Sequence, residues 1–301
     1  MTKTTPDTSD PQVLKSDGLL VLVTLLAAFG WIFSKEALQG LPPHLFIGIR
    51  FTCASIVLVL LFWKRHAILR HTPLRPILLS GALFAGALTL WIGGLYHTRQ
   101  LGVGAFLTSL AIVLVPVASQ LLFRERVAFQ SWLAIPISFS GLALLALEEA
   151  ITFESGQLYF LTAALLFSVH FTMTSQVARQ VPAIPLTSCQ LMFAGLVNLI
   201  VSPFIETAPN EVASSIWVWV AASVLLATCL RFSLQFFAQS LASSSHAAII
   251  LTLEPVFTTL LAYLWFAETL SLWQGIGCSL IFMALLVARW HLIKPLFKRS
   301  L

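Results

Sequence analysis

Long apolar segments separated by short polar ones run along almost the whole chain. Alternation with a period of two is absent, so the pattern does not favour barrel strands. Each apolar segment is long enough to cross the hydrocarbon core of a bilayer as a helix, which takes about 20 residues. The ten predicted spans are residues 18–34, 43–63, 74–96, 101–123, 131–147, 157–178, 184–205, 214–238, 246–266 and 272–290. We therefore predict an all-α integral membrane protein with ten transmembrane helices.

The composition agrees with this pattern. Hydrophobic residues make up 58% of the 301 residues and charged residues only 10%, whereas a soluble domain has about 25% charged residues. The polar segments at the ends are short. We predict that residues 1–17 form a disordered cytoplasmic leader and that residues 293–301 form a basic cytoplasmic tail.

Lysine and arginine are distributed unequally between the two predicted sides of the membrane. One side holds Lys3, Lys15, Lys64, Arg65, Arg70, Arg75, Arg124, Arg126, Arg179, Arg289, Lys294, Lys298 and Arg299, whereas the other side holds only Lys35 and Arg99. The positive-inside rule then predicts a multi-pass protein of the cell inner (plasma) membrane with both termini in the cytoplasm. Basic residues that set the orientation and lie near anionic lipid account for the net charge of +5. No nucleic-acid partner is therefore expected.

The two halves of the chain resemble each other. Residues 106–132 and 249–275 both contain a proline within a span, followed by an acid and a new span. Glu125 aligns with Glu268 and Ser109 aligns with Thr252, each at an offset of 143 residues (268 − 125 = 143). Five spans in each half, residues 18–150 and 151–292, place the halves in the membrane with opposite orientation. Inverted repeats of this kind are typical of transporters, whose substrate site lies between the halves.

Three motifs extend this comparison. The fourth span contains A-F-L-T-S-L-A-I-V-L-V-P, the ninth and tenth contain L-E-P-V-F-T-T-L-L-A-Y-L-W-F-A-E-T-L-S-L-W-Q-G-I-G, and the second contains I-R-F. In these motifs the chain resembles the drug/metabolite transporter superfamily, whose members have two EamA-type domains. The two halves of this chain would be the first and second EamA-type repeats. The resemblance implies a secondary transporter that exports small metabolites, such as amino acids or their derivatives, by alternating access around a central cavity. A drug or lipid flippase of the same superfamily is the alternative.

Ionisable residues inside predicted spans are the main candidates for function, because burying charge in a membrane is costly. Arg231, Glu254 and His170 each lie about 11 Å from the inner end of their span, so they can meet in one layer. Thr228, Arg231 and Gln235 recur at helical spacing and share one face. The predicted substrate-binding residues are Arg231, Glu254, His170, Gln235, Thr228, Trp31 and Trp91, with a helix break at Pro255.

The acid at position 254 has two interpretations. In the first, Arg231 binds a substrate carboxylate and Glu254 binds an ammonium group or carries a coupled proton. In the second, the two side chains neutralise each other and hold their helices together. An arginine in contact would stabilise the carboxylate and make Glu254 a poor proton carrier. For Arg50, near the outer end of its span, we expect a structural role at the interface or in a pair with Glu36 or Glu149.

Other classes of protein are disfavoured by the motifs. The seven histidines are scattered and form no H-E-x-x-H pattern, so we expect neither a metal site nor the catalytic residues of a membrane enzyme. A glycine-rich phosphate loop is absent, so we expect no nucleotide and no other cofactor. The expected partners are a small-molecule substrate and membrane lipid, with the protein acting as a monomer or a homodimer.

Overall fold

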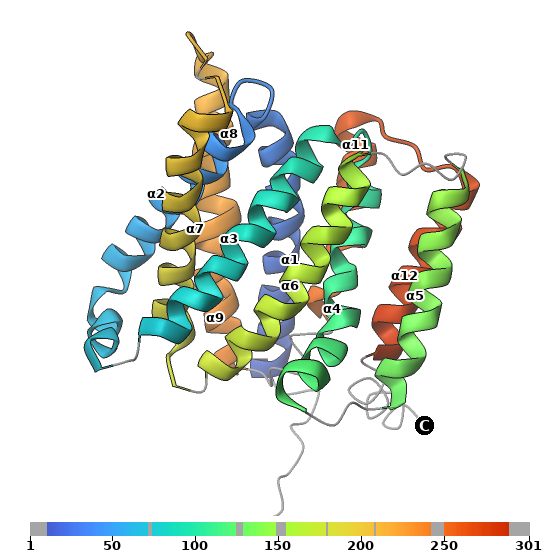
Figure 1. Ribbon diagram of the computed structural model, residues 1–301, viewed down its shortest axis with the longest axis horizontal. Helices are drawn as coiled ribbons and strands as arrows, with labels where there is room; N and C mark the ends of the chain where they lie inside the picture. The colour runs from blue at the N-terminus through green and yellow to red at the C-terminus, as the bar shows by residue number, and fades with distance from the viewer. Residues whose placement is uncertain are drawn as a thin grey trace, which may run out of the picture.

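The computed structural model describes residues 11–71, 74–124, 129–148, 155–178, 180–207, 209–241 and 250–288, which form helices and no strand. The first half contains α1 (Pro11–Ala37), α2 (Pro43–Leu61), the short η1 (Trp63–His71), α3 (Leu74–His97), α4 (Leu101–Phe123) and α5 (Phe129–Glu148). The second half contains α6 (Ser155–Val177), α7 (Ala183–Ile205), α8 (Ser214–Val224), η2 (Leu225–Leu230), α9 (Arg231–Leu241), α11 (Glu254–Phe266) and α12 (Leu272–Ala288). The helices run roughly side by side (Figure 1).

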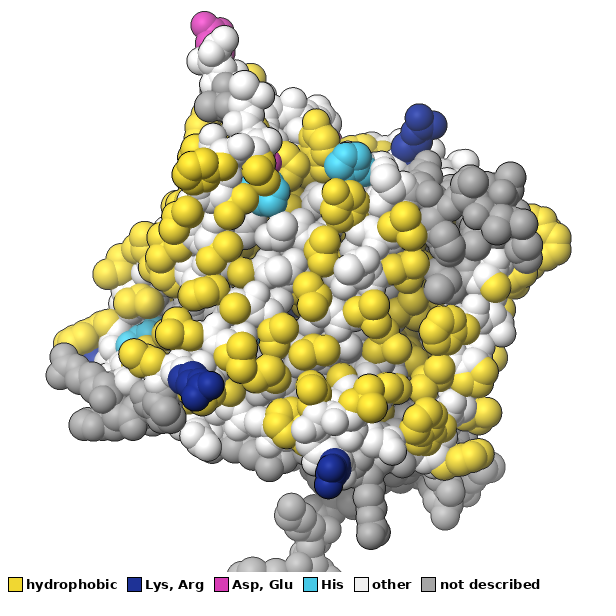
Figure 2. All heavy atoms as spheres, in the orientation of Figure 1, with side chains coloured by type: hydrophobic (Ala, Val, Ile, Leu, Met, Phe, Trp, Pro, Cys, Tyr) yellow, Lys and Arg dark blue, Asp and Glu magenta, His cyan; other side chains and the backbone are white. Residues whose placement is uncertain are grey.

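Seven helical stretches of the described residues are long and apolar enough to cross a membrane. They are Asp17–Ala37, Pro43–Leu61, Leu74–His97, Leu101–Phe123, Ser155–Val177, Ala183–Ile205 and Ser214–Gln235, and two shorter apolar helices are Trp132–Gly141 and Leu272–Val287. Hydrophobic side chains cover the middle of the face in Figure 2, and the few charged ones lie toward its upper and lower ends. An exposed apolar belt of this kind is the surface of a multi-pass membrane protein. The chain is therefore all-α and membrane-embedded, while the predicted count of ten spans stays a prediction.

Helix pairing defines the interior. α2 packs along α7, and α6 packs along both α3 and α4. α1 contacts α8, α9 and α11, so it lies inside the bundle, whereas α5 and α12 pair with each other at one edge of the molecule (Figure 1). The main core contains Phe46, Phe160 and Ile92, which are fully buried. Apolar burial and van der Waals packing between helices hold these pairs together.

Three segments differ from the predicted spans. α1 already begins at Pro11, so residues 11–17 of the predicted leader are helical, because proline is well tolerated in a first helical turn; residues 1–10 lie outside the described part. The eighth predicted span contains a π-helical segment, η2, between α8 and α9. The ninth span is interrupted by a turn at Thr252 and Leu253, and Pro255 lies in the first turn of α11.

Two carboxylates from loops cap helix N-termini. Glu206 accepts hydrogen bonds from the backbone N–H groups of His44 (2.7 Å) and Leu45 (3.0 Å) at the start of α2. Glu268 accepts one from the N–H of Leu101 (2.9 Å), the first residue of α4. These N–H groups have no partner within their own helix, and the positive end of the helix dipole favours an anion there. Each acid thus connects the loop after one helix to the start of another.

The Glu268 cap predicts a pH dependence of stability. Burial raises the pKa of the Glu268 carboxyl above its ordinary value of about 4.5, although the N–H groups of Leu101 and Gly102 and the charge of Lys35 act in the opposite direction. An acid whose folded-state pKa is raised contributes stability that is present below its unfolded-state pKa and is lost as pH rises through the folded-state pKa. We expect the unfolding temperature of the purified protein in detergent to fall as pH rises from the unfolded-state pKa of Glu268 through its folded-state pKa. Glu268→Gln should remove the part of this fall that the Glu268 carboxyl causes. Equal slopes for Glu268→Gln and the wild type would contradict this role for Glu268.

Candidate functional site

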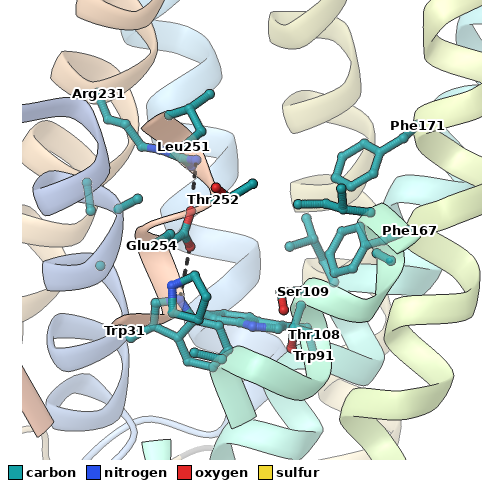
Figure 3. A pocket seen from close by; sticks show the side chains of 18 of the residues that line it. Trp31, Trp91, Thr108, Ser109, Phe167, Phe171, Arg231, Leu251, Thr252 and Glu254 are labelled. Carbon is teal, nitrogen blue, oxygen red and sulfur yellow. Dashed lines mark hydrogen bonds and ion pairs between the residues drawn. The ribbon is translucent and has the colours of Figure 1, made fainter. Parts of the chain in front are cut away.

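A cavity of about 680 Å³ lies among the helices. Its lining comes from α1, α2, α3, α4, α6, η2, α9 and α11, together with Leu251, Thr252 and Leu285. Most of the lining is apolar or aromatic, with a few polar groups, which is the usual composition of a small-molecule site. In Figure 3 the labelled side chains of Arg231, Glu254 and Trp31 face those of Phe167, Phe171 and Ser109 across the opening.

The central polar feature is a chain of three side chains. Arg231 Nη2 lies 3.7 Å from Glu254 Oε2, and the indole N–H of Trp31 donates a hydrogen bond to Glu254 Oε1 at 3.2 Å. Figure 3 shows Glu254 between these two partners. The side chains of Arg231 and Glu254 are 24% and 29% exposed, so the ion pair is open to the cavity. The structural interpretation of Glu254 requires the ion pair, and the substrate-binding interpretation requires exposure to the cavity. Both features are present.

Local irregularities in two helices position this pair. Thr228 donates a hydrogen bond to the carbonyl of Ser223, five residues earlier (2.8 Å), inside the π-helical segment η2. Arg231 follows as the first residue of α9. Glu254 is the first residue of α11, directly after the turn at Thr252 and Leu253. Isolated π-helical turns are frequently found at functional sites, and a proline is tolerated in a first turn because its missing N–H would be unpaired there anyway.

Most of the other predicted residues also line the cavity. They are Thr228, Gln235, Trp31, Trp91 and Pro255. The rings of Trp31 and Trp91 meet edge to face at 4.9 Å between centroids, which fixes both indoles. Arg231 Nε and Gln235 Oε1 are buried and have no hydrogen-bond partner among the described residues. Buried polar atoms without a partner are costly, so these two atoms mark where a polar ligand group would be stabilised.

His170 lies apart from this group. It is 3% exposed and does not line the cavity. Its Nδ1 lies 3.1 Å from the carbonyl oxygen of Ser80, and its ring stacks on Phe84 at 4.7 Å. The depth argument grouped His170 with Arg231 and Glu254, but depth does not determine the direction of a side chain around a helix. Its ring packs behind Phe84, which itself lines the cavity.

The expected role of Arg50 at the membrane interface is wrong. Arg50 is 7% exposed and lines the cavity, and its Nη1 and Nε donate to the hydroxyls of Ser34 (2.7 Å) and Thr228 (3.1 Å). These inward hydrogen bonds compensate the cost of burying the guanidinium charge better than extension of the side chain through lipid to the interface would. Glu36 instead pairs with Gln39 and with the indole of Trp265, and Glu149 lies outside the described residues.

The sequence interpretation also missed three lining residues on facing helices, Thr108, Ser109 and Phe171. The pairing of Ser109 with Thr252 was a signal, because Thr252 also lines the cavity. The hydroxyls of Thr108 and Ser109 donate to carbonyls within their own helix, as such side chains commonly do. Composition alone does not distinguish such residues from ordinary helix surface. Glu125, the other acid of the repeat, lies outside the described residues.

A mostly apolar cavity with a few charged groups, enclosed by membrane helices, is the kind of small-molecule site that transporters have. The chain belongs to the EamA-like transporter family, whose signature matches residues 14–147 and again residues 154–290.

Several proteins are similar to this chain along most of its length. An uncharacterized transporter of Archaeoglobus fulgidus is 27% identical over 91% of this chain and 85% of its own. The uncharacterized transporter YoaV of Bacillus subtilis is 22% identical over 87% of this chain and 92% of its own. A solved crystal structure has a similar fold, with a TM-score of 0.64 and 19% identity over 89% of this chain and 96% of that one. These likenesses support a transporter and its fold.

Proposed function

We propose that this transporter moves small metabolites such as amino acids or their derivatives, and that the cavity holding Arg231 and Glu254 is its substrate site. The observation that carries the proposal is a cation and an anion 3.7 Å apart on the wall of a 680 Å³ cavity in an apolar bundle. A carboxylate and an ammonium group of one substrate could exchange partners with this pair. The apolar remainder of the lining would contact the side chain of such a substrate.

The mechanism we propose is alternating access of two inverted five-helix halves within a ten-helix chain. In such an arrangement, contacts occur in symmetry-related pairs. In the repeat, α1 corresponds to α6, α3 to α8 and α4 to α11. The contact of α3 with α6 therefore matches that of α8 with α1, and the contact of α4 with α6 matches that of α11 with α1. The described non-glycine residues with positive φ are Arg124 after α4 and Ala267 after α11, at the same offset as the sequence repeat (267 − 124 = 143). Equivalent helix ends in the two halves support the repeat.

The orientation follows from the distribution of Lys and Arg. We propose that both termini are cytoplasmic and that the protein resides in the cell inner membrane. Under this orientation Lys35 and Glu268 lie at the outer side. Lys35 Nζ donates to the carbonyls of Leu95 and Thr98 at the end of α3, so this cluster connects helices at one end of the bundle. Release to that side would be export.

The ion pair itself bears on the driving force. Glu254 already contacts Arg231 at 3.7 Å, so we propose that this pair exchanges its partners with the substrate and that a coupling ion binds elsewhere. The same contact allows a purely structural role for the pair. About a quarter of each side chain is exposed and both residues line the cavity, so a substrate could reach both charges.

Counterflow in liposomes tests this function. We expect exchange of at least one labelled amino acid or derivative by the wild type, and a loss of roughly tenfold or more for Arg231→Ala and Glu254→Gln, since each removes one charge-assisted contact. Arg75→Ala is the matched control, because Arg75 is exposed at the start of α3. Unchanged exchange by both cavity variants would contradict the proposed site. If nothing in the panel exchanges, the amino-acid class is wrong, and drugs or lipids become the candidates.

A further inference from the structure

Arg50 is the most buried charged side chain of the cavity. It extends from α2 and donates to hydroxyls on two neighbouring elements, Ser34 on α1 and Thr228 in η2. The guanidinium also lies 5.1 Å from the centroid of the Phe51 ring. Its Nη2 has no hydrogen-bond partner among the described residues. An arginine held this firmly, with one nitrogen left for a ligand, is preorganised for binding.

A glycine, Gly30, packs beside Nη2. A Cβ atom at Gly30 would lie 3.6 Å from Arg50 Nη2 and 3.0 Å from the Cβ of Ala227. Gly30 itself lines the cavity. A larger residue there would occupy the approach to the guanidinium. Arg50 lines the same cavity, so its guanidinium borders the space available to a ligand.

The charges of the lining do not balance. Its charged side chains, among the described residues, are Arg50, Arg231 and Glu254. Glu254 contacts Arg231 and Trp31, whereas the partners of Arg50 are neutral hydroxyls. The cavity wall therefore has one more cation than anion. An uncompensated cation in an apolar interior is costly unless an anion joins it.

We propose that Arg50 is the anion-binding residue of the cavity and that the substrate is a monoanion, a small apolar carboxylate without a free ammonium group. The carboxylate would accept hydrogen bonds from Nη2 of Arg50 and leave the Arg231–Glu254 pair intact. The apolar body of the substrate would contact Phe84, Phe167 and Trp91, which line the same cavity. This inference rests on the proposed substrate site, but it moves the carboxylate contact from Arg231 to Arg50 and narrows the cargo to carboxylates whose amine is absent or blocked.

Three ligands that differ in charge test the inference on the unchanged protein. N-acetyl-leucine, leucine and leucinamide share one apolar body and have net charges of about −1, 0 and +1 near neutral pH. We expect isothermal titration of the purified protein to rank their affinities in that order, with N-acetyl-leucine at least about tenfold tighter than leucine. Because this ranking uses the wild type, it does not depend on the folding of any variant. Leucine binding as tightly as N-acetyl-leucine would overturn the inference.

Variants then assign the preference to Arg50. We expect Arg50→Gln to abolish the preference for N-acetyl-leucine and Arg50→Lys to retain part of it, because lysine keeps the charge but not the planar fork. Arg65→Gln is the control, since Arg65 is exposed in η1, outside the cavity. A preference that persists in Arg50→Gln would overturn the role of Arg50.

The same ligands separate this inference from the proposed function. Counterflow of leucine but not of N-acetyl-leucine would refute the monoanion and leave the amino-acid transporter standing. Counterflow of N-acetyl-leucine but not of leucine would support the inference and restrict the proposed substrates to derivatives. If all three ligands fail in both binding and counterflow, the inference and the proposed substrate class fall together.

Discussion

The Gly195→Ala variant is expected to lose much of the protein's thermal stability. Gly195 lies in α7 against α2, and a Cβ atom there would meet the Thr52 hydroxyl and lie 2.6 Å from the Thr52 backbone N. Backbone atoms of a packed helix cannot move aside as a flexible side chain can. Overpacking of this kind costs about 1–3 kcal/mol or more. We expect the unfolding temperature of the purified protein in detergent to fall by roughly 5 °C or more.

Gly275→Ala provides the matched control. Gly275 is in α12, and a Cβ atom at this position would meet nothing within 4 Å. Alanine is the better helix former by about 1 kcal/mol. The unfolding temperature should therefore stay the same or rise slightly. Equal losses in both variants, or no loss in Gly195→Ala, would contradict the close approach of α7 and α2.

The Glu206→Ala variant should be the second strongly destabilised one. The Glu206 carboxylate accepts hydrogen bonds from the N–H groups of His44 and Leu45 and from the Ser202 hydroxyl (2.7 Å). Its removal leaves the first turn of α2 uncapped and breaks the hydrogen-bonded link from the end of α7 to that turn, although the packing of α2 along α7 remains. Hydrogen bonds to a charged group contribute about 1.5–3 kcal/mol each. We expect a loss of about 2–4 kcal/mol in the free energy of unfolding, measured by denaturation in detergent.

Glu211→Ala is the control for the loss of an acid from the same loop. Glu211 is exposed and makes no hydrogen bond or ion pair with another described residue. Its substitution should change the free energy of unfolding by less than about 0.5 kcal/mol. Glu206→Gln should recover part of the loss, since an amide oxygen still accepts one of the N–H bonds. A Glu206→Ala variant as stable as Glu211→Ala would refute the cap.

Membrane helices were predictable because their signal is local. A run of about 20 apolar residues must satisfy its own backbone hydrogen bonds in lipid, and this requirement alone specifies a helix. The bounds of α4, Leu101–Phe123, are those of the predicted fourth span. The π-helical segment η2 was not predicted; within it the Thr228 hydroxyl donates to the Ser223 carbonyl and accepts a hydrogen bond from Arg50 of another helix. No local pattern contains that contact.

The candidate site was predictable in part, because some of its residues also give a local signal in the sequence. Arg231 and Glu254 stood out because charge within an apolar run is rare, and rarity needs no structure to detect. Trp31 and Trp91 were singled out from the many aromatic residues, and both line the cavity. His170 and Arg50 show the limit of this reasoning. Counting residues estimates only the position along a helix, whereas the rotation of each helix about its axis is set by packing against neighbours that lie far away in the sequence.

The sequence by itself determined that this protein is an all-helical membrane protein of a transporter family, that its halves resemble each other, and which charges lie within apolar runs. Only the tertiary structure decided which of those charges share a cavity. Apolarity and helical period are properties of a single segment and can be counted along the chain. The partners of Arg50, Ser34 and Thr228, come from helices 16 and 178 residues away. Such contacts arise only when helices pack together, because the direction of each side chain depends on that packing.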